Sequence, residues 1–175
     1  MIEKNICKFI CAGGILTTAA VLFQSAPVFL PIIGLALSPL STLPVAIASV
    51  LNISLGFTVF ISSALILALV CTQEAIILLC ATGLLGIVIG SLLNRKGVVV
   101  SILISSTALS FGLIFLTYIV GISVFVNLTN SLSTPLILLI FFSFSLVYAG
   151  IWSICLIKFI NRLMKISFVS QISRT

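Results

Sequence analysis

The stretch that decides the fold is Ala75–Leu93, AIILLCATGLLGIVIGSLL, which contains no charged residue. As a helix, this stretch is long enough to cross the hydrocarbon core of a bilayer, which needs about 20 mostly apolar residues. The rest of the chain is similar, because 62% of its 175 residues are hydrophobic and only 6% are charged. Soluble domains contain roughly half and a quarter, respectively. We therefore expect an integral membrane protein made almost entirely of membrane-spanning helices.

The positions of lysine and arginine predict how the chain is threaded. The eight basic residues lie in three places, which are Lys4 and Lys8, Arg95 and Lys96, and finally Lys158, Arg162, Lys165 and Arg174. The positive-inside rule makes all three places cytoplasmic, so an even number of spans must separate Lys8 from Arg95. The length of that interval fits four spans of about 20 residues.

The predicted fold is thus all-α, a polytopic membrane helix bundle of about six transmembrane helices with both termini inside and a proline-broken second segment. The chain is treated as a single integral membrane domain, with spans at about 9–26, 31–50, 53–71, 75–93, 98–126 and 136–157 and a basic cytoplasmic tail at 158–175. A five-span alternative places the N-terminus outside and merges the second and third apolar runs into one long helix and a re-entrant piece. That alternative leaves Lys4 and Lys8 on the wrong side of the membrane.

Four of the five prolines, Pro27, Pro31, Pro39 and Pro44, fall within eighteen residues. Each proline removes an amide donor and disturbs the preceding helical turn, so the segment 38–44 is expected to be kinked or unwound. The hydroxyls that could bond the freed carbonyls belong to Ser38, Ser41 and Thr42. Broken helices mark substrate sites in many transporters, which gives the functional interpretation. The alternative interpretation is a purely structural kink.

Glu74 is one of only two acidic residues and begins the fourth apolar run. With Thr72 as the expected N-cap, the Glu74 carboxylate would lie at the positive end of a helix dipole, which explains it without a function. The functional hypothesis is that Gln73 and Glu74 face an outward cavity and bind a cation or an amine. Further candidates for the lining of that cavity are Tyr118, Asn127, Asn130, Ser38, Ser41 and Thr42.

Small residues predict where helices approach closely. Gly86 and Gly90 form a GxxxG motif on the fourth span, and Ser101 and Ser105 have the same spacing on the fifth. We expect these four residues to pack the fourth and fifth spans against each other. Trp152, together with Tyr148, is expected to anchor the sixth span at the membrane interface.

The sequence argues against most kinds of chemistry. It has no histidine, and its two acids, Glu3 and Glu74, are far apart in sequence. We therefore predict no catalytic residues, metal ligands or cofactor, and an enzyme is not expected. The five cysteines form no CxxC pair and are expected to be small, buried, reduced residues. Without a soluble basic surface, nucleic-acid binding is not expected. No span carries a polar stripe suited to an ion pore.

Three segments carry a resemblance to a known family. APVFLPIIGLALSPLSTLPVAIAS, EAIILLCATGLLGIVIGSLLNRKG and the helix end KFINRLMK resemble the YybS-like multi-spanning membrane proteins of bacteria. That family is similar in layout to the S components of energy-coupling-factor transporters. The resemblance implies a bacterial plasma membrane, an outward ligand cavity, and a transmembrane coupling protein with ATPase subunits as partners. The AxxxA docking pattern of S components has only small-residue substitutes here, at Gly13/Thr17 and Gly14/Thr18.

Two classes of function follow. The first is a membrane-embedded substrate-binding subunit for uptake of a small metabolite, energised by a separate ATPase module because the sequence contains no glycine-rich phosphate loop. The second is a non-transporting membrane scaffold or envelope-assembly protein, in which the polar residues only cap and anchor helices. A bound ligand and a partner ATPase distinguish the first class from the second.

Overall fold

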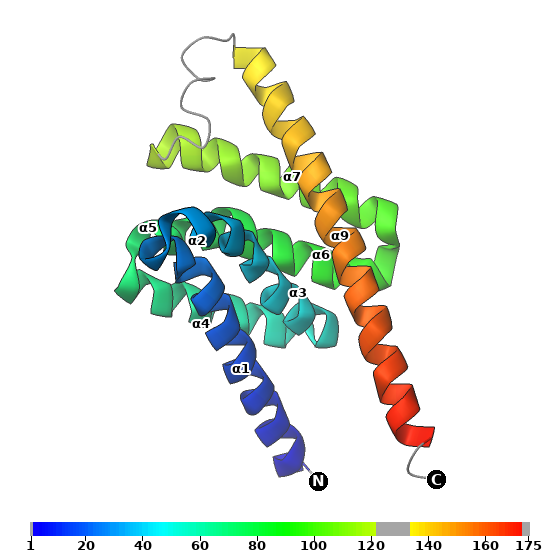
Figure 1. Ribbon diagram of the computed structural model, residues 1–175. Coiled ribbons are helices and arrows are strands. Elements are labelled where there is room, and N and C mark those ends of the chain that lie inside the picture. Colours follow the sequence, from blue (N-terminus) through cyan, green and yellow to red (C-terminus); the bar gives the residue numbers. More distant parts are fainter. Residues whose placement is uncertain (1, 122–133, 173–175) are drawn as a thin grey trace.

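The computed structural model describes residues 2–121 and 134–172, and every regular element in these two ranges is a helix. Six of the helical stretches are long and apolar enough to cross a membrane, namely Phe9–Phe29, Pro31–Leu51, Ile53–Val70, Thr72–Leu93, Val98–Val120 and Pro135–Ile160. The start of the first helix and the end of the last lie at the same end of the bundle (Figure 1), as an even number of crossings requires. The predicted all-α, six-span fold is confirmed, and its architecture is that of a multi-pass integral membrane protein.

Within residues 2–121, the helices follow one another directly or with a one-residue connection. In chain order they are α1 (Ile2–Phe29), α2 (Pro31–Leu37), the 3₁₀ helix η1 (Ser38–Ser41), α3 (Thr42–Leu51), α4 (Ile53–Val70), α5 (Thr72–Ile77), the π-helix η2 (Leu78–Thr82), α6 (Gly83–Lys96), α7 (Val98–Phe115), the π-helix η3 (Leu116–Val120) and α9 (Thr134–Ile172). Elements that follow without a gap share one span, so α5, η2 and α6 form the fourth span and α7 with η3 forms the fifth.

Three helix ends differ from the predicted span ends. Helix α1 contains Pro27 and continues to Phe29, beyond the predicted end at residue 26, because a proline removes one hydrogen bond without forcing a membrane helix to stop. The described part of the fifth span ends at Val120, where Gly121 adopts a left-handed conformation with φ 78°; residues 122–126 of the predicted span lie outside the described residues. Helix α9 continues to Ile172, so residues 158–172 of the predicted tail are part of the same helix.

The second span is broken, as predicted, at its prolines. The 3₁₀ helix η1 separates α2 from α3, so the backbone tightens there and is not unwound. The predicted role of the hydroxyls is wrong for Ser41, whose Oγ donates a hydrogen bond to the Gln24 side chain at 2.6 Å. Thr42 Oγ1 is buried and has no hydrogen-bond partner in the described part of the chain. The 3₁₀ turn therefore leaves the Ser41 hydroxyl available to another span.

The GxxxG motif of α6 packs against α3, and not against α7 as predicted. A Cβ atom added to Gly86 would lie 2.9 Å from the Thr42 carbonyl oxygen, and one added to Gly90 would lie 2.5 Å from the carbonyl oxygen of Ala46. The close approach is possible because α3 presents small side chains there, Ala46 and Ser49. The motif identified a close helix contact correctly but gave the wrong partner.

Helix α7 lies between α6 and α9 and packs against both. Ser101 and Ser105 are buried in α7, as expected for residues of a helix contact. The contact of α7 with the fourth span includes Gly112, whose hydrogen atoms face the backbone carbonyl of Cys80 so closely that a Cβ atom would overlap it. In this close contact the fifth span contributes Gly112, and the fourth span contributes the backbone of η2.

Two predictions about exposure are wrong. Trp152 is only 8% exposed and belongs to the buried cluster formed mainly by α6, α7 and α9. Its ring centroid lies 6.1 Å from that of Tyr148. Trp152 is therefore a core residue and not an interfacial anchor. None of the five cysteines is buried, although all are free thiols; Cys7, Cys11 and Cys155 are exposed, and Cys71 and Cys80 are partly exposed. Small apolar thiols are tolerated on a surface that meets lipid.

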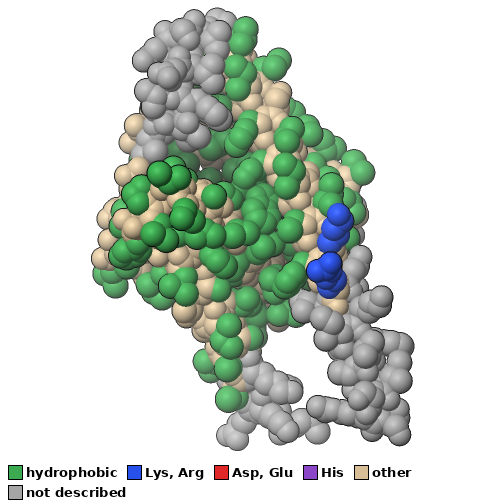
Figure 2. Space-filling model, in the orientation of Figure 1, with side chains coloured by type: hydrophobic (Ala, Val, Ile, Leu, Met, Phe, Trp, Pro, Cys, Tyr) green, Lys and Arg blue, Asp and Glu red, His purple; other side chains and the backbone are tan. Residues whose placement is uncertain are grey.

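The outer surface of the bundle is largely hydrophobic. Figure 2 shows hydrophobic side chains over most of the visible face, with the described basic side chains gathered at one place on α9. These basic side chains belong to Lys158 and Arg162, which are exposed near the end of the last span. A surface of this kind fits contact with a lipid bilayer, where apolar side chains replace the polar surface of soluble proteins.

Candidate functional site

A group of buried polar side chains surrounds Gln24, near the C-terminal end of α1. Gln24 is 0% exposed, and its Oε1 accepts hydrogen bonds from Ser41 Oγ at 2.6 Å and from Thr82 Oγ1 at 3.0 Å. Its Nε2 donates a hydrogen bond to Glu74 Oε2 at 2.8 Å. We call Gln24, Ser41, Glu74 and Thr82 the Gln24 cluster. It joins the first, second and fourth spans through side chains that are far apart in sequence.

The π-helix η2 brings two residues of the cluster to the same side of the fourth span. Glu74 in α5 and Thr82 at the end of η2 are eight positions apart, which on a uniform α-helix would separate them by about 80° around the axis. A π-helical turn is wider and rotates less per residue, so it brings Thr82 back toward the side of Glu74. Both side chains can therefore reach the amide of Gln24.

The Gln24 cluster extends from the end of the bundle toward the middle of the membrane. Glu74 lies in the first turn of α5 and is partly exposed. Thr82 is ten positions into the span Thr72–Leu93, which corresponds to a depth of about 15 Å at the rise of an α-helix. Half of the hydrocarbon core of a bilayer is also about 15 Å thick. The cluster thus extends from one end of the bundle toward its middle, and the positive-inside rule predicts that this end is the outer one.

The electrostatics of the site depend on Glu74. Its carboxylate lies in the first turn of α5, near the positive end of the helix dipole. The predicted N-cap is wrong, because α5 begins at Thr72, Cys71 is the N-cap, and no side chain makes a capping hydrogen bond. In the described residues, Oε2 of Glu74 bonds Gln24 and its Oε1 makes no protein hydrogen bond. Among the described residues, a second acceptor thus lies unbonded at the partly exposed end of the cluster.

The other predicted site residues are distributed unevenly. Gln73 is exposed beside Glu74, and Ser38 is partly buried in η1. Thr42 is fully buried next to Ser41. Tyr118 is 54% exposed on η3 and makes no hydrogen bond to the Gln24 cluster. Asn127 and Asn130 lie outside the described residues. Of the predicted residues, the structure thus joins Glu74 and Ser41, through Gln24.

Sequence reasoning missed Gln24 and Thr82. A signal for Gln24 was present, because an amide inside an apolar span must find hydrogen-bond partners or lose several kcal/mol of transfer free energy. Its partners could have been sought among the polar residues of other spans. Thr82 carried no comparable signal, because a threonine hydroxyl can bond to its own helix.

The Gln24 cluster offers one amide, two hydroxyls and one carboxylate. Within residues 2–121 and 134–172, no group of three or more His, Cys, Asp and Glu side chains could hold a metal ion. The arrangement can therefore accept a cation or a hydrogen-bond donor at Glu74, whose Oε2 is held in place by the amide of Gln24. Comparison of the chain with models of protein families, with curated proteins and with solved structures finds no match.

Proposed function

We propose that the protein is a membrane-embedded substrate-binding subunit for uptake of a small metabolite. The observation that carries this proposal is the Gln24 cluster, which places a carboxylate, an amide and two hydroxyls in a continuous hydrogen-bonded series from the end of α5 toward the midplane. Polar side chains inside membrane helices are costly and commonly mark substrate or ion pathways. The cluster also includes the 3₁₀ break in the second span, a feature typical of transporter substrate sites.

The chemistry of the cluster indicates the class of substrate. Glu74 provides the negative charge of the site, and its Oε1 has no protein hydrogen bond among the described residues. A solute with an ammonium or another cationic donor group would pair with that oxygen. We therefore propose a small cationic or amine-bearing metabolite, which enters from the side on which Glu74 lies.

Uptake would need a partner to supply energy. The sequence contains no glycine-rich phosphate loop, so an ATPase would have to be a separate subunit. The resemblance to YybS-like proteins, and through them to S components of energy-coupling-factor transporters, supports a coupling protein in the bacterial plasma membrane. On α1, a candidate docking face is Gly14 and Thr18, which are exposed; a Cβ atom on Gly14 would meet no other atom within 4 Å.

A second candidate function is a membrane scaffold, and one observation favours it. Both acceptor positions of Gln24 Oε1 are occupied by hydroxyls of the same chain, as in a polar network that only fixes helix positions. A scaffold of this kind would have no ligand and would tolerate loss of the charge on Glu74.

The experiment that separates the two functions is native mass spectrometry of the protein extracted from its own membranes in mild detergent. The decisive variant is Glu74→Gln, which removes the charge and keeps an acceptor for Gln24. Glu3→Gln is the matched control, because it removes the other acidic charge, at the opposite end of α1. A stoichiometric small-molecule adduct that is kept in Glu3→Gln and lost in Glu74→Gln supports substrate binding. The absence of any adduct, or an adduct unaffected by Glu74→Gln, contradicts it.

A further inference from the structure

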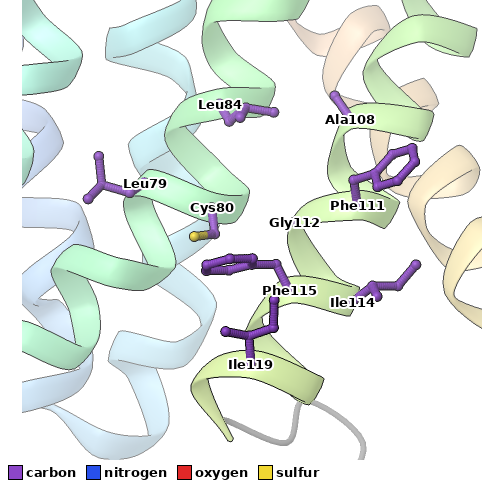
Figure 3. A pocket seen from close by; sticks show the side chains of 9 residues that line it. All are labelled: Leu79, Cys80, Leu84, Ala108, Phe111, Gly112, Ile114, Phe115 and Ile119. Carbon is purple, nitrogen blue, oxygen red and sulfur yellow. The ribbon is translucent and has the colours of Figure 1, made fainter.

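An apolar groove lies between the fourth and fifth spans, on the other side of η2 from Thr82. Its volume is about 520 Å³, which is within the range of small-ligand sites. Figure 3 shows its lining, with residues of η2 and α6 on one side and residues of α7 and η3 on the other. The lining residues are Leu79, Cys80, Leu84, Ala108, Phe111, Gly112, Ile114, Phe115 and Ile119.

Within this groove the backbones of the two spans lie close together at Gly112, and larger side chains lie around that contact. At Gly112 the α7 backbone lies directly against the carbonyl of Cys80, so no side chain separates the helices there. The ring of Phe115 lies beside Cys80 (Figure 3). Ala108, one turn before Gly112, contributes only a methyl group. Residues of both π-helices line the groove, and π-helical turns occur frequently at functional sites.

The dimensions of the groove match one leaflet of a bilayer. Along the fifth span its lining runs from Ala108 to Ile119, eleven positions, or about 16 Å of helix. Ile119 is next to Val120, the last residue of the described part of that span, so the lining extends from that end of the span toward its middle. Half of the hydrocarbon core is about 15 Å thick.

The lining restricts what can occupy the groove. It includes no charged, amide or hydroxyl side chain, so a polar solute would lose its hydration without gaining partners. The groove is continuous with the lipid-facing surface, where Phe111 is 75% exposed and Ile119 is 71% exposed. A transmembrane helix would not fit inside the groove, because 16 Å of helix with a diameter of about 10 Å fills about 1,300 Å³.

We propose that the groove binds one hydrocarbon chain of a lipid from the leaflet at the Glu74 end of the bundle. The chain lies along α7 between Phe111, Phe115 and Ile119, with its end near Leu84 and Ala108. Because η2 carries both Cys80 and Thr82, the bound chain contacts the same helical turn that ends the Gln24 cluster. The lipid site does not depend on the proposed function of that cluster.

The experiment uses the full chain in nanodiscs that contain a phospholipid with a diazirine group in one acyl chain. After illumination, mass spectrometry of peptides locates the adducts. Leu79, Leu84 and Phe115 are the groove positions to be compared with exposed apolar positions outside the groove, such as Leu65 and Leu139. The test variant is Ala108→Phe, which fills the groove. Its control is Ala68→Phe at an exposed alanine of α4 outside the groove.

We expect the groove positions to carry several-fold more adducts than the outside positions, and we expect Ala108→Phe, but not Ala68→Phe, to abolish the excess. Adducts distributed in proportion to side-chain exposure in the unmodified protein would overturn the proposal, whether or not Ala108→Phe folds. An excess that persists in folded Ala108→Phe would also overturn it. The melting temperature of each variant in detergent shows whether it is folded.

Discussion

The substitution Gly90→Ala tests the packing of α6 on α3 most directly. A Cβ atom at position 90 would lie 2.5 Å from the Ala46 carbonyl oxygen and 2.6 Å from Ser49 Cβ. Ordinary contacts need about 3.5 Å, so α3 would have to move away by about 1 Å. Overpacking of this kind costs about 1–3 kcal/mol, and alanine recovers about 0.5–1 kcal/mol through its helix preference. We expect the free energy of unfolding to fall by about 1–2 kcal/mol.

Gly14→Ala is the matched control, because Gly14 is also inside a helix and a Cβ atom there would meet no other atom within 4 Å. It should leave the protein unchanged or stabilise it by about 0.5–1 kcal/mol. The assay is reversible unfolding by SDS in mixed micelles, followed by circular dichroism. Equal stability of the two variants would refute the packing described for Gly90.

A double-mutant cycle identifies the partner helix. Ser49→Gly removes the α3 atom that would lie 2.6 Å from the new Cβ, so it should recover part of the stability lost in Gly90→Ala. Ser101→Gly on α7 should recover none. Recovery by Ser101→Gly alone would show that α6 uses its GxxxG face against α7, as the sequence predicted.

Two further predictions concern the Gln24 cluster and the orientation of the chain. Gln24→Leu leaves three buried or partly buried polar groups without their partner and should lower the free energy of unfolding by about 1–3 kcal/mol. The control Gln73→Leu, at the exposed neighbour of Glu74, should change the free energy of unfolding by about 0.5 kcal/mol or less. Equal effects of the two substitutions would show that the cluster contributes no stability. The orientation is tested in intact cells with single cysteines in a cysteine-free background. Gln73→Cys, just after the end of α4, should react with a membrane-impermeant maleimide, whereas Ser54→Cys, near the start of α4, should react only after permeabilisation. The reverse pattern would invert the predicted topology.

The spans could be predicted from the sequence because bilayer thickness fixes their length. The third span was predicted at residues 53–71 and is Ile53–Val70; Asn52 caps it by accepting a hydrogen bond from the Ser54 amide. The helix ends that differ from the predicted span ends follow from backbone conformations that composition does not reveal. One is the tolerance of Pro27 inside α1, and another is the left-handed Gly121 after η3.

The pairing of helices could not be predicted in the same way. In a membrane, helices do not associate by burial of apolar surface away from water, so close packing and polar contacts select the partners. A GxxxG motif reveals that one face of α6 can approach another backbone, but Gly86 and Gly90 fit any partner with small side chains at the matching depth. Thr42, Ala46 and Ser49 provide that face on α3. Which helix packs against the motif depends on the arrangement of all the helices in the bundle.

The same reasoning explains why only part of the candidate site was found. Glu74 and Ser41 were identified as polar residues at unusual positions, one at a helix start and one in a proline-rich segment. The residue that joins them, Gln24, lies in a span with no break near it, and its hydrogen bonds to Thr82 and Glu74 cross 58 and 50 positions of sequence. A lone amide in an apolar helix requires partners but does not name them. The π-helix η2 selects Thr82, because without its wider turn the Thr82 hydroxyl would point to a different side of the span. Each polar residue within a membrane span should therefore be expected to make a hydrogen bond, and helix geometry determines the partner of that bond.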